Sequence, residues 1–91
     1  MNEHVIVKLK EITYNMVIGQ YSAADVLTAD CNSILFLNYG ATVANVNGVP
    51  IPPGGNFGIA GNVGEVDITQ YTFSFTGPGS NLLIVVRKFY K

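Results

Sequence analysis

The sequence predicts an all-β protein, and three observations lead to that fold class. A complete strand, turn, strand, turn, strand pattern lies within residues 42–60, TVANVNGVPIPPGGNFGIA. Other segments alternate apolar and polar residues with the period of two that half-buried strands show. Turn signals built from glycine, proline and asparagine separate these segments. We therefore expect a single small antiparallel domain over residues 1–91, in which residues 1–30 are a candidate assembly arm or strand ribbon.

The first thirty residues allow more than one interpretation. Residues 5–10 alternate, and a second strand is expected from residue 12 to residue 18, with Gly19 as its end. The join near Glu11 is either a break or a bulge within one long ribbon. Residues 22–30, SAADVLTAD, predict either a short helix that starts with a capping box or a strand over residues 25–29.

The next strand is expected over Ile34–Tyr39. It begins with four consecutive large apolar residues, a pattern typical of strands that are covered on both faces. Such a strand is either central in its sheet or meets another subunit through its outer face. Gly40 ends it.

The central hairpin is predicted by its turn chemistry. Asparagine and glycine tolerate the positive φ of a two-residue type I′ turn, and apolar residues flank the pair. Two prolines followed by two glycines then end the second strand, since proline lacks an N–H and glycine permits a sharp reversal. The turn-forming residues are Asn47, Gly48, Pro52, Pro53, Gly54 and Gly55.

The C-terminal third predicts further strands at residues 57–60, 65–69, 71–76 and 82–90. Within 71–76 aromatic residues alternate with threonine and serine, so one face should enter the core and the other is suited to water. Around eight strands with short turns indicate a β-sandwich, a jelly-roll-like fold or a small barrel. Periodicity does not choose among them.

The composition favours association. Hydrophobic residues make up 48% of the chain, charged residues 12%, and the net charge is −1. Ordinary soluble domains carry about twice that charged fraction, and a sparse charge near zero promotes self-association. We expect a homo-oligomer held by the outer faces of residues 34–37 and of the last strand. The predicted interface residues are Ile34, Phe36, Leu82, Ile84, Val86, Lys88 and Tyr90.

The cations lie at the two ends of the chain, as Lys8, Lys10, Arg87, Lys88 and Lys91. If the first and last strands are neighbours, one edge is basic. That edge either protects against unwanted strand pairing or makes a basic-to-acidic contact between subunits. Five cations in a net acidic chain are too few for a nucleic-acid footprint. The longest apolar run, Leu82–Val86, is far shorter than the roughly twenty residues of a membrane-spanning helix.

No catalytic pattern is present. The single histidine, His4, lies in the N-terminal tail and the single cysteine, Cys31, in a turn region, which argues against a nucleophile–base pair. Glu65 and Asp67 share a strand face, as a cation site needs, but the segment lacks the oxygen density of a dedicated Ca²⁺ loop. The glycine-rich turns lack a phosphate-binding pattern. We predict a non-enzymatic protein without metal or cofactor.

The C-terminal two-thirds also carries a resemblance. An Asn-Gly hairpin, a Pro-Gly turn, the segment Gly61–Asp67 (GNVGEVD) and the basic, aromatic run 82–90 follow one another between residues 38 and 91. Together they resemble small β-sandwich structural proteins of tailed-bacteriophage virions, particularly phages of Bacteroidetes. The resemblance implies a virion component that decorates a capsid, occupies a vertex or anchors a fibre, with other virion proteins as partners. It transfers no functional site.

A carbohydrate- or receptor-binding module is the alternative. Lectin-like domains stack sugars on aromatic faces beside polar groups. The chain offers five tyrosines for such a platform, namely Tyr14, Tyr21, Tyr39, Tyr71 and Tyr90.

Overall fold

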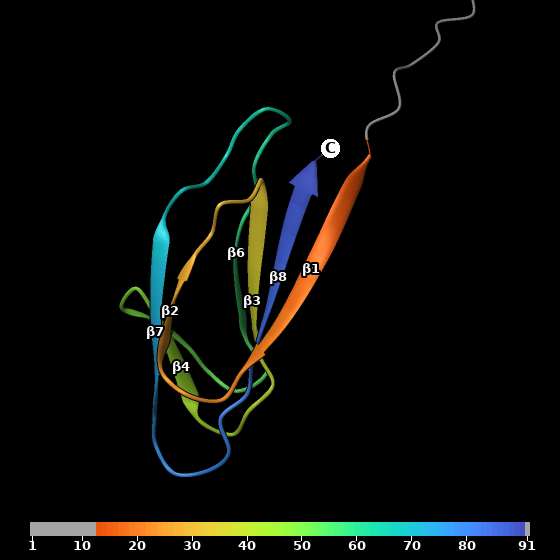
Figure 1. The fold of residues 1–91 in the computed structure, drawn as a ribbon. Helices are drawn as coiled ribbons and strands as arrows, with labels where there is room; N and C mark the ends of the chain where they lie inside the picture. Colours follow the sequence, from red (N-terminus) through yellow and green to blue (C-terminus); the bar gives the residue numbers. More distant parts are fainter. Residues whose placement is uncertain (1–12, 91) are drawn as a thin grey trace, which may run out of the picture.

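The computed structural model describes residues 13–90. Within that range it contains eight β-strands and no helix (Figure 1). Accordingly, the described residues include no helix that could span a membrane. The strands are β1 (Tyr14–Tyr21), β2 (Asp25–Thr28), β3 (Ser33–Asn38), β4 (Val43–Val46), β5 (Val49–Ile51), β6 (Asn56–Ile59), β7 (Gln70–Thr76) and β8 (Leu83–Tyr90).

The strands form two antiparallel four-stranded sheets, ordered β1-β8-β3-β6 and β2-β7-β4-β5. β1 pairs with β8, β2 with β7, β3 with β6 and β4 with β5. The pairs β1-β8 and β3-β6 belong to one sheet, and β2-β7 and β4-β5 belong to the other. This nested pairing is the jelly-roll arrangement of a β-sandwich. Figure 1 shows the sheets as two layers. The antiparallel sandwich is therefore confirmed, and the barrel alternative is wrong because the sheets stay separate.

The core lies between the two sheets and follows from side-chain alternation. Buried and half-buried residues alternate along β3, along β4 and in the first half of β8. The buried residues are those whose side chains point toward the other sheet. Aromatic pairs link the layers, since the rings of Phe36 and Tyr71 have centroids 5.1 Å apart and those of Tyr21 and Phe73 4.9 Å apart. The buried apolar residues are Ala29, Cys31, Ile34, Phe36, Ala44, Val46, Ile51, Tyr71, Phe73, Leu83 and Val85.

The predicted turns are confirmed. Asn47 and Gly48 have φ values of 47° and 82°, as a type I′ turn requires, and connect β4 to β5. The Asn47 side chain also reaches β7, where its Oδ1 accepts a hydrogen bond of 2.8 Å from the Thr72 amide. Gly54 has a φ of 80°, and the Gly55 amide donates to the Pro52 carbonyl at 2.8 Å, which closes the turn after β5.

One buried polar side chain joins three segments at an end of the sandwich. Asn38 is 1% exposed, and its Nδ2 donates to the carbonyls of Thr42 at 2.7 Å and Ile51 at 2.8 Å. Its Oδ1 accepts from the Gly40 amide at 3.0 Å. The Asn38 side chain therefore satisfies backbone groups that the β3–β4 connection and β5 would otherwise bury without partners.

Of the two alternatives for residues 22–30, the strand is confirmed as β2 and the helix is not formed. Two other predictions on strand positions need correction. Gly19 does not end its strand, because it pairs with Val85 and the ring of Tyr21 covers it. Residues 65–69 form an extended loop with a single bridge between Cys31 and Asp67.

Part of the candidate arm at residues 1–30 belongs to the sandwich, since residues 14–28 supply β1 and β2. The first and last described strands are neighbours, as β1 pairs with β8 along its whole length. The remaining N-terminal predictions lie outside the described residues. They concern the strand at residues 5–10, the join at Glu11, and the side chains of His4, Lys8, Lys10 and Lys91.

Candidate interaction surface

The outer face of the β1-β8-β3-β6 sheet is apolar. β3 buries Ile34 and Phe36, so Leu35 and Leu37 point away from the core. The registers then place Val86 beside Leu35 and Ile84 beside Leu37. On β1, Ile18 and Met16 continue the same face beside Val86 and Lys88. We call this set the apolar face, and its members are Met16, Ile18, Leu35, Leu37, Ile84 and Val86.

One row of the apolar face ends in a groove. Ile18, Val86 and Leu35 lie side by side across three strands, and the next residue along the row is Gly58 of β6. A side chain is missing there, and the Leu35 side chain leans into the space, with Cδ1 2.9 Å from where a Cβ on Gly58 would be. The open groove has a volume of about 310 Å³ and its lining includes Met16 and Ile59.

An aromatic and cationic cluster lies at one end of this face. The ammonium of Lys88 is 4.3 Å from the ring centroid of Tyr14 and 4.9 Å from that of Tyr90. The two rings meet edge to face, with centroids 6.2 Å apart. Such cation–π contacts hold a lysine against aromatic faces. Among the described residues, Lys88 is the only charged side chain on this face.

The outer face of the other sheet has a different character. β7 turns Tyr71 and Phe73 inward, so its hydroxyl and amide side chains face outward, and Asn45 of β4 lies beside Ser74. Three apolar residues interrupt this face, namely Val26 beside Thr72, Val43 beside Thr76 and Pro50 beside Asn45. The polar face consists of Thr28, Asn45, Gln70, Thr72, Ser74 and Thr76. A contiguous apolar patch on one side only marks an interaction surface, whereas single exposed apolar residues do not.

The structure corrects two of the predicted interface residues. Ile84, Val86, Lys88 and Tyr90 lie on the outward side of β8. Ile34 and Phe36 were predicted beside them, but they are 2% and 0% exposed because they point into the core. The outward side chains of β3 are the intervening leucines. A run of four apolar residues does not reveal which two face outward.

One further predicted residue and two residues that were not predicted complete that comparison. Leu82 precedes β8 and is half-buried, and its carbonyl accepts a hydrogen bond of 3.0 Å from the Tyr39 amide. Met16 and Ile18, which are 55% and 63% exposed, were missed as interface residues. The available signal was the period-two spacing of Tyr14, Met16 and Ile18 in the sequence.

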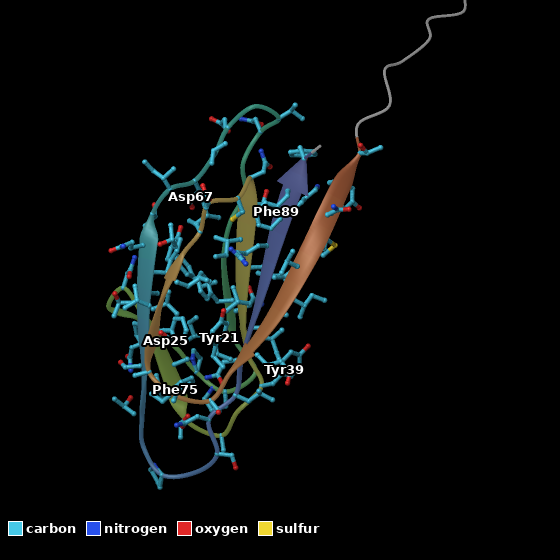
Figure 2. The ribbon with its side chains drawn as sticks, in the orientation of Figure 1. Tyr21, Asp25, Tyr39, Asp67, Phe75 and Phe89 are labelled. Atoms are coloured by element: carbon cyan, nitrogen blue, oxygen red, sulfur yellow. The ribbon has the colours of Figure 1, made fainter. Side chains whose placement is uncertain are left out.

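The tyrosines do not form one platform. Tyr71 is 5% exposed and its hydroxyl donates to Asp67 at 2.7 Å, and Tyr21 packs on Phe73. Tyr39 is 68% exposed at the opposite end of the sandwich from Asp67 (Figure 2). A sugar-stacking site that includes Tyr71 is therefore excluded by burial.

The two carboxylates of the 60–69 loop serve separate turns rather than one cation site. Oε1 of Glu65 accepts from the Asn62 amide at 2.7 Å, and Oδ1 of Asp67 accepts from the Thr69 amide at 2.8 Å. Nδ2 of Asn32 donates to the carbonyls of Asn62 and Glu65, the latter at 2.9 Å, which ties the loop to the start of β3. Among the described residues, no group of three or more His, Cys, Asp or Glu is placed to hold a metal ion.

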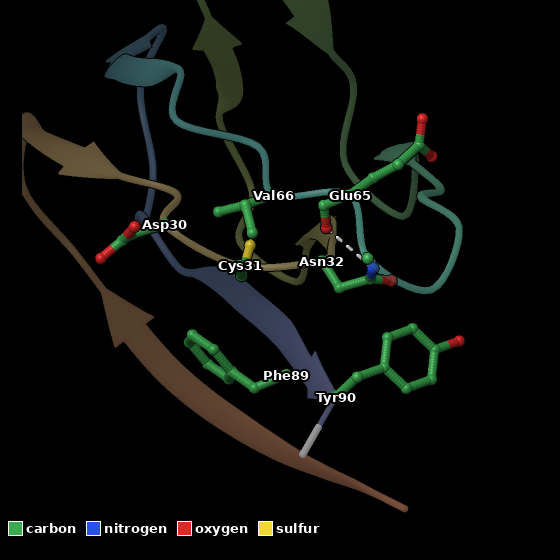
Figure 3. A pocket seen from close by; sticks show the side chains of 8 residues that line it. Asp30, Cys31, Asn32, Glu65, Val66, Phe89 and Tyr90 are labelled. Carbon is green, nitrogen blue, oxygen red and sulfur yellow. Dashed lines mark hydrogen bonds between the residues drawn. The ribbon is translucent and has the colours of Figure 1, made fainter. Parts of the chain in front are cut away.

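A cavity of about 150 Å³ lies beneath this loop, between Cys31, Val66 and Phe89 (Figure 3). Burial, and secondarily Asp67, raises the pKa of the Cys31 thiol, so the reactive thiolate is disfavoured. Burial and the bond to Asp67 raise the pKa of Tyr71 to about 12. Burial opposes ionisation of Asp67, but hydrogen bonds from Thr69 and Tyr71 outweigh it and lower its pKa. These shifts follow from burial and from the hydrogen bonds that join Asp67, Thr69 and Tyr71.

Fold and surface together define a small jelly-roll sandwich with one apolar and one polar face. Comparison with known proteins adds no relative: no family model, curated protein or solved structure matches the chain.

Proposed function

We propose that this chain is a non-enzymatic structural protein of a tailed-phage virion, which self-associates and docks on other virion proteins. It would act as a capsid-decorating, vertex or fibre-anchoring component. The observation that carries the proposal is the contrast between the apolar face and the polar face of one sandwich. The jelly-roll architecture is compatible with it, because viral capsid domains use this fold. Lectins use it too, so the surface carries the argument.

The dimensions of the apolar face suit assembly by repetition. Its four strands contain eight, eight, six and four residues, so the sheet covers about 400 Å² at ~3.3 Å per residue and ~4.8 Å per strand. This area is the flat footprint of the whole sheet, and the same face on every copy suits repeated contacts in an assembly.

The described side chains also support a role without catalysis. The Cys31 thiol is buried with a raised pKa, and the carboxylates of Glu65 and Asp67 are occupied by backbone amides. A nucleophile needs an adjacent base and an accessible position. The thiol of Cys31 is not accessible, since the residue is 2% exposed.

Sedimentation velocity from micromolar to submillimolar concentration tests the proposal. The native chain should show concentration-dependent association, and the double variant Leu35→Thr, Val86→Thr should weaken it strongly, since threonine keeps the strand propensity and removes apolar surface. The control is Val26→Thr, which repeats the valine-to-threonine change of the double variant on the opposite sheet and should leave association intact. A native chain that stays monomeric, or a double variant that associates like the native chain, would count against self-association through this face.

One observation favours the carbohydrate-binding alternative, namely the exposed ring of Tyr39. Saturable binding on a glycan array that Tyr39→Ala abolishes would support it. Binding unaffected by Tyr39→Ala, or none at all, would leave the structural role as the better proposal.

A further inference from the structure

The four edge strands of the sandwich differ in how well they resist pairing with another strand. β2 has four residues and begins with Asp25, β5 has three residues and contains Pro50, and β6 has four residues with Gly58 among them. Short length, charge and proline are the usual means of protecting a sheet edge. β1 has eight residues and carries neither charge nor proline. It is the unprotected edge of the described fold.

β1 is also exposed on both of its faces. Met16 and Ile18 are exposed on the outer face, and Val17, which points to the other side of the sheet, is 43% exposed. Strand β8 is its only neighbour among the described strands, so within residues 13–90 no strand pairs with its second edge. A long, apolar and unpaired edge strand is a template for another strand.

We propose that the free edge of β1 pairs antiparallel with β1 of a second copy, about a two-fold axis at Val17. The inference rests on the self-association in the proposed function and specifies its partner and register. A two-fold contact uses the same surface of both copies, so the strand must match its own reverse. The pairing would join two four-stranded sheets into one continuous sheet.

The sequence of β1 selects this register. Side chains alternate between faces, so the outer face continues across the contact only if an even-numbered residue opposes an even-numbered one. Centring on Val17 opposes Met16 to Ile18 twice and Val17 to itself, so every central pair is apolar. Asn15 then opposes Gly19 and Tyr14 opposes Gln20. Centring on Ile18 instead would oppose Met16 to Gln20 and Val17 to Gly19, which loses the apolar matches.

Charge and area both favour a second copy as the occupant. β1 carries no charge, so identical edges meet without repulsion. Lys88 lies one strand back, with its ammonium over the rings of Tyr14 and Tyr90. The joined sheet would present the two apolar faces side by side and would double the flat footprint of one sheet to about 800 Å².

Cysteine cross-linking tests the register directly. Opposed residues of an antiparallel pair have Cα atoms about 4.5–5.5 Å apart, within the range of about 4.4–6.8 Å that a disulfide spans. With diamide as the oxidant, Val17→Cys should form a covalent dimer. Asn15→Cys should not, because its copies are offset along the strands, and the native chain should not, because Cys31 is buried. A Val17→Cys chain that cross-links no faster than Asn15→Cys would overturn the register.

Charge variants test the pairing without covalent chemistry. Val17→Lys and Val17→Glu should each associate at least about tenfold more weakly than the native chain, because like charges then face each other at the axis. An equimolar mixture should recover association through the opposite charges. Val26→Lys on β2 is the control, and unchanged thermal melts confirm folding of every variant.

The outcomes separate this inference from the proposed function. If Val17→Lys associates like the native chain while Leu35→Thr, Val86→Thr does not, edge pairing is wrong and association through the apolar face stands. If the native chain is monomeric and Val17→Cys fails to cross-link, both are wrong.

Discussion

Replacing Asn38 tests whether one buried amide organises the end of the sandwich. Its side chain makes three hydrogen bonds, to the carbonyls of Thr42 and Ile51 and from the amide of Gly40. Asn38→Ala removes all three, so that two carbonyls and one N–H each lose a hydrogen bond at a buried position. Each buried unsatisfied group costs about 1–3 kcal/mol. Water that enters the vacated space recovers part of this, so we expect a loss of about 3 kcal/mol in the free energy of unfolding.

The variant Asn38→Asp separates hydrogen bonding from shape. An aspartate carboxylate has nearly the same volume, but it sets an oxygen where Nδ2 now lies 2.7 and 2.8 Å from two carbonyl oxygens. Burial and these carbonyls should raise the pKa of the introduced carboxyl above its ordinary value of about 3.9. A raised folded-state pKa means that stability is fully present below about pH 3.9 and is lost as the pH rises through the folded-state pKa. Asn38→Asp should therefore be more stable in acid, relative to Asn38→Ala, than at neutral pH.

Urea unfolding followed by far-ultraviolet circular dichroism measures both effects, with Asn45→Ala as the matched control. Asn45 lies on the polar face and makes one exposed hydrogen bond, to Thr76 at 3.2 Å. Its replacement should cost less than about 1 kcal/mol. Domains of this kind have about 5–15 kcal/mol of total stability, so the Asn38 loss is readily measured. Equal costs for Asn38→Ala and Asn45→Ala would refute the reasoning.

Two further predictions concern the network beneath the 60–69 loop. Tyr71→Phe should cost about 1 kcal/mol, because the bond to partly exposed Asp67 is discounted by solvent; urea titrations across pH check it. Because the pKa of Asp67 is lowered in the folded chain, the native chain should lose stability below about pH 4. Because the pKa of Tyr71 is raised, the native chain should also lose stability as the pH rises from about 10 to about 12. The stability of Tyr71→Phe should change less in both pH ranges. Identical profiles of stability against pH for the variant and the native chain would argue against the hydrogen bond between Tyr71 and Asp67. Cys31 should react with a thiol reagent far more slowly in the folded chain than in urea, and equal rates would show that the thiol is not protected.

Local chemistry made most of the fold predictable. The Asn47-Gly48 pair fixes a hairpin because its backbone requirement is local, and the alternation in residues 71–76 fixes which face enters the core. The nested pairing of strands distant in sequence was not predictable, since periodicity carries no information on partners. Residues 65–69 alternate like a strand, yet their backbone pairs only in part, through Asp67 with Cys31 and Thr69 with Ala29. The carboxylates of Glu65 and Asp67 accept hydrogen bonds from loop amides instead.

The candidate surface was only partly predictable for a related reason. On β8 the predicted residues Ile84, Val86, Lys88 and Tyr90 lie on the outward side, although the inward set also contains a cation, Arg87. On β3 the four consecutive apolar residues gave no marker of the outward side, and the wrong pair was chosen. The role of Asn38 also depends on carbonyls brought together only by the tertiary fold.

The most direct test of the central claim is a dilution series of the native chain followed by backbone amide chemical shifts. If the apolar face is an interface, the concentration-dependent shifts should fall on β1, β3 and β8, around Met16, Ile18, Leu35 and Val86. The polar face of β7 should remain unchanged and serves as the internal reference. Shifts that are independent of concentration, or that fall on Thr72 and Ser74 instead, would contradict the account.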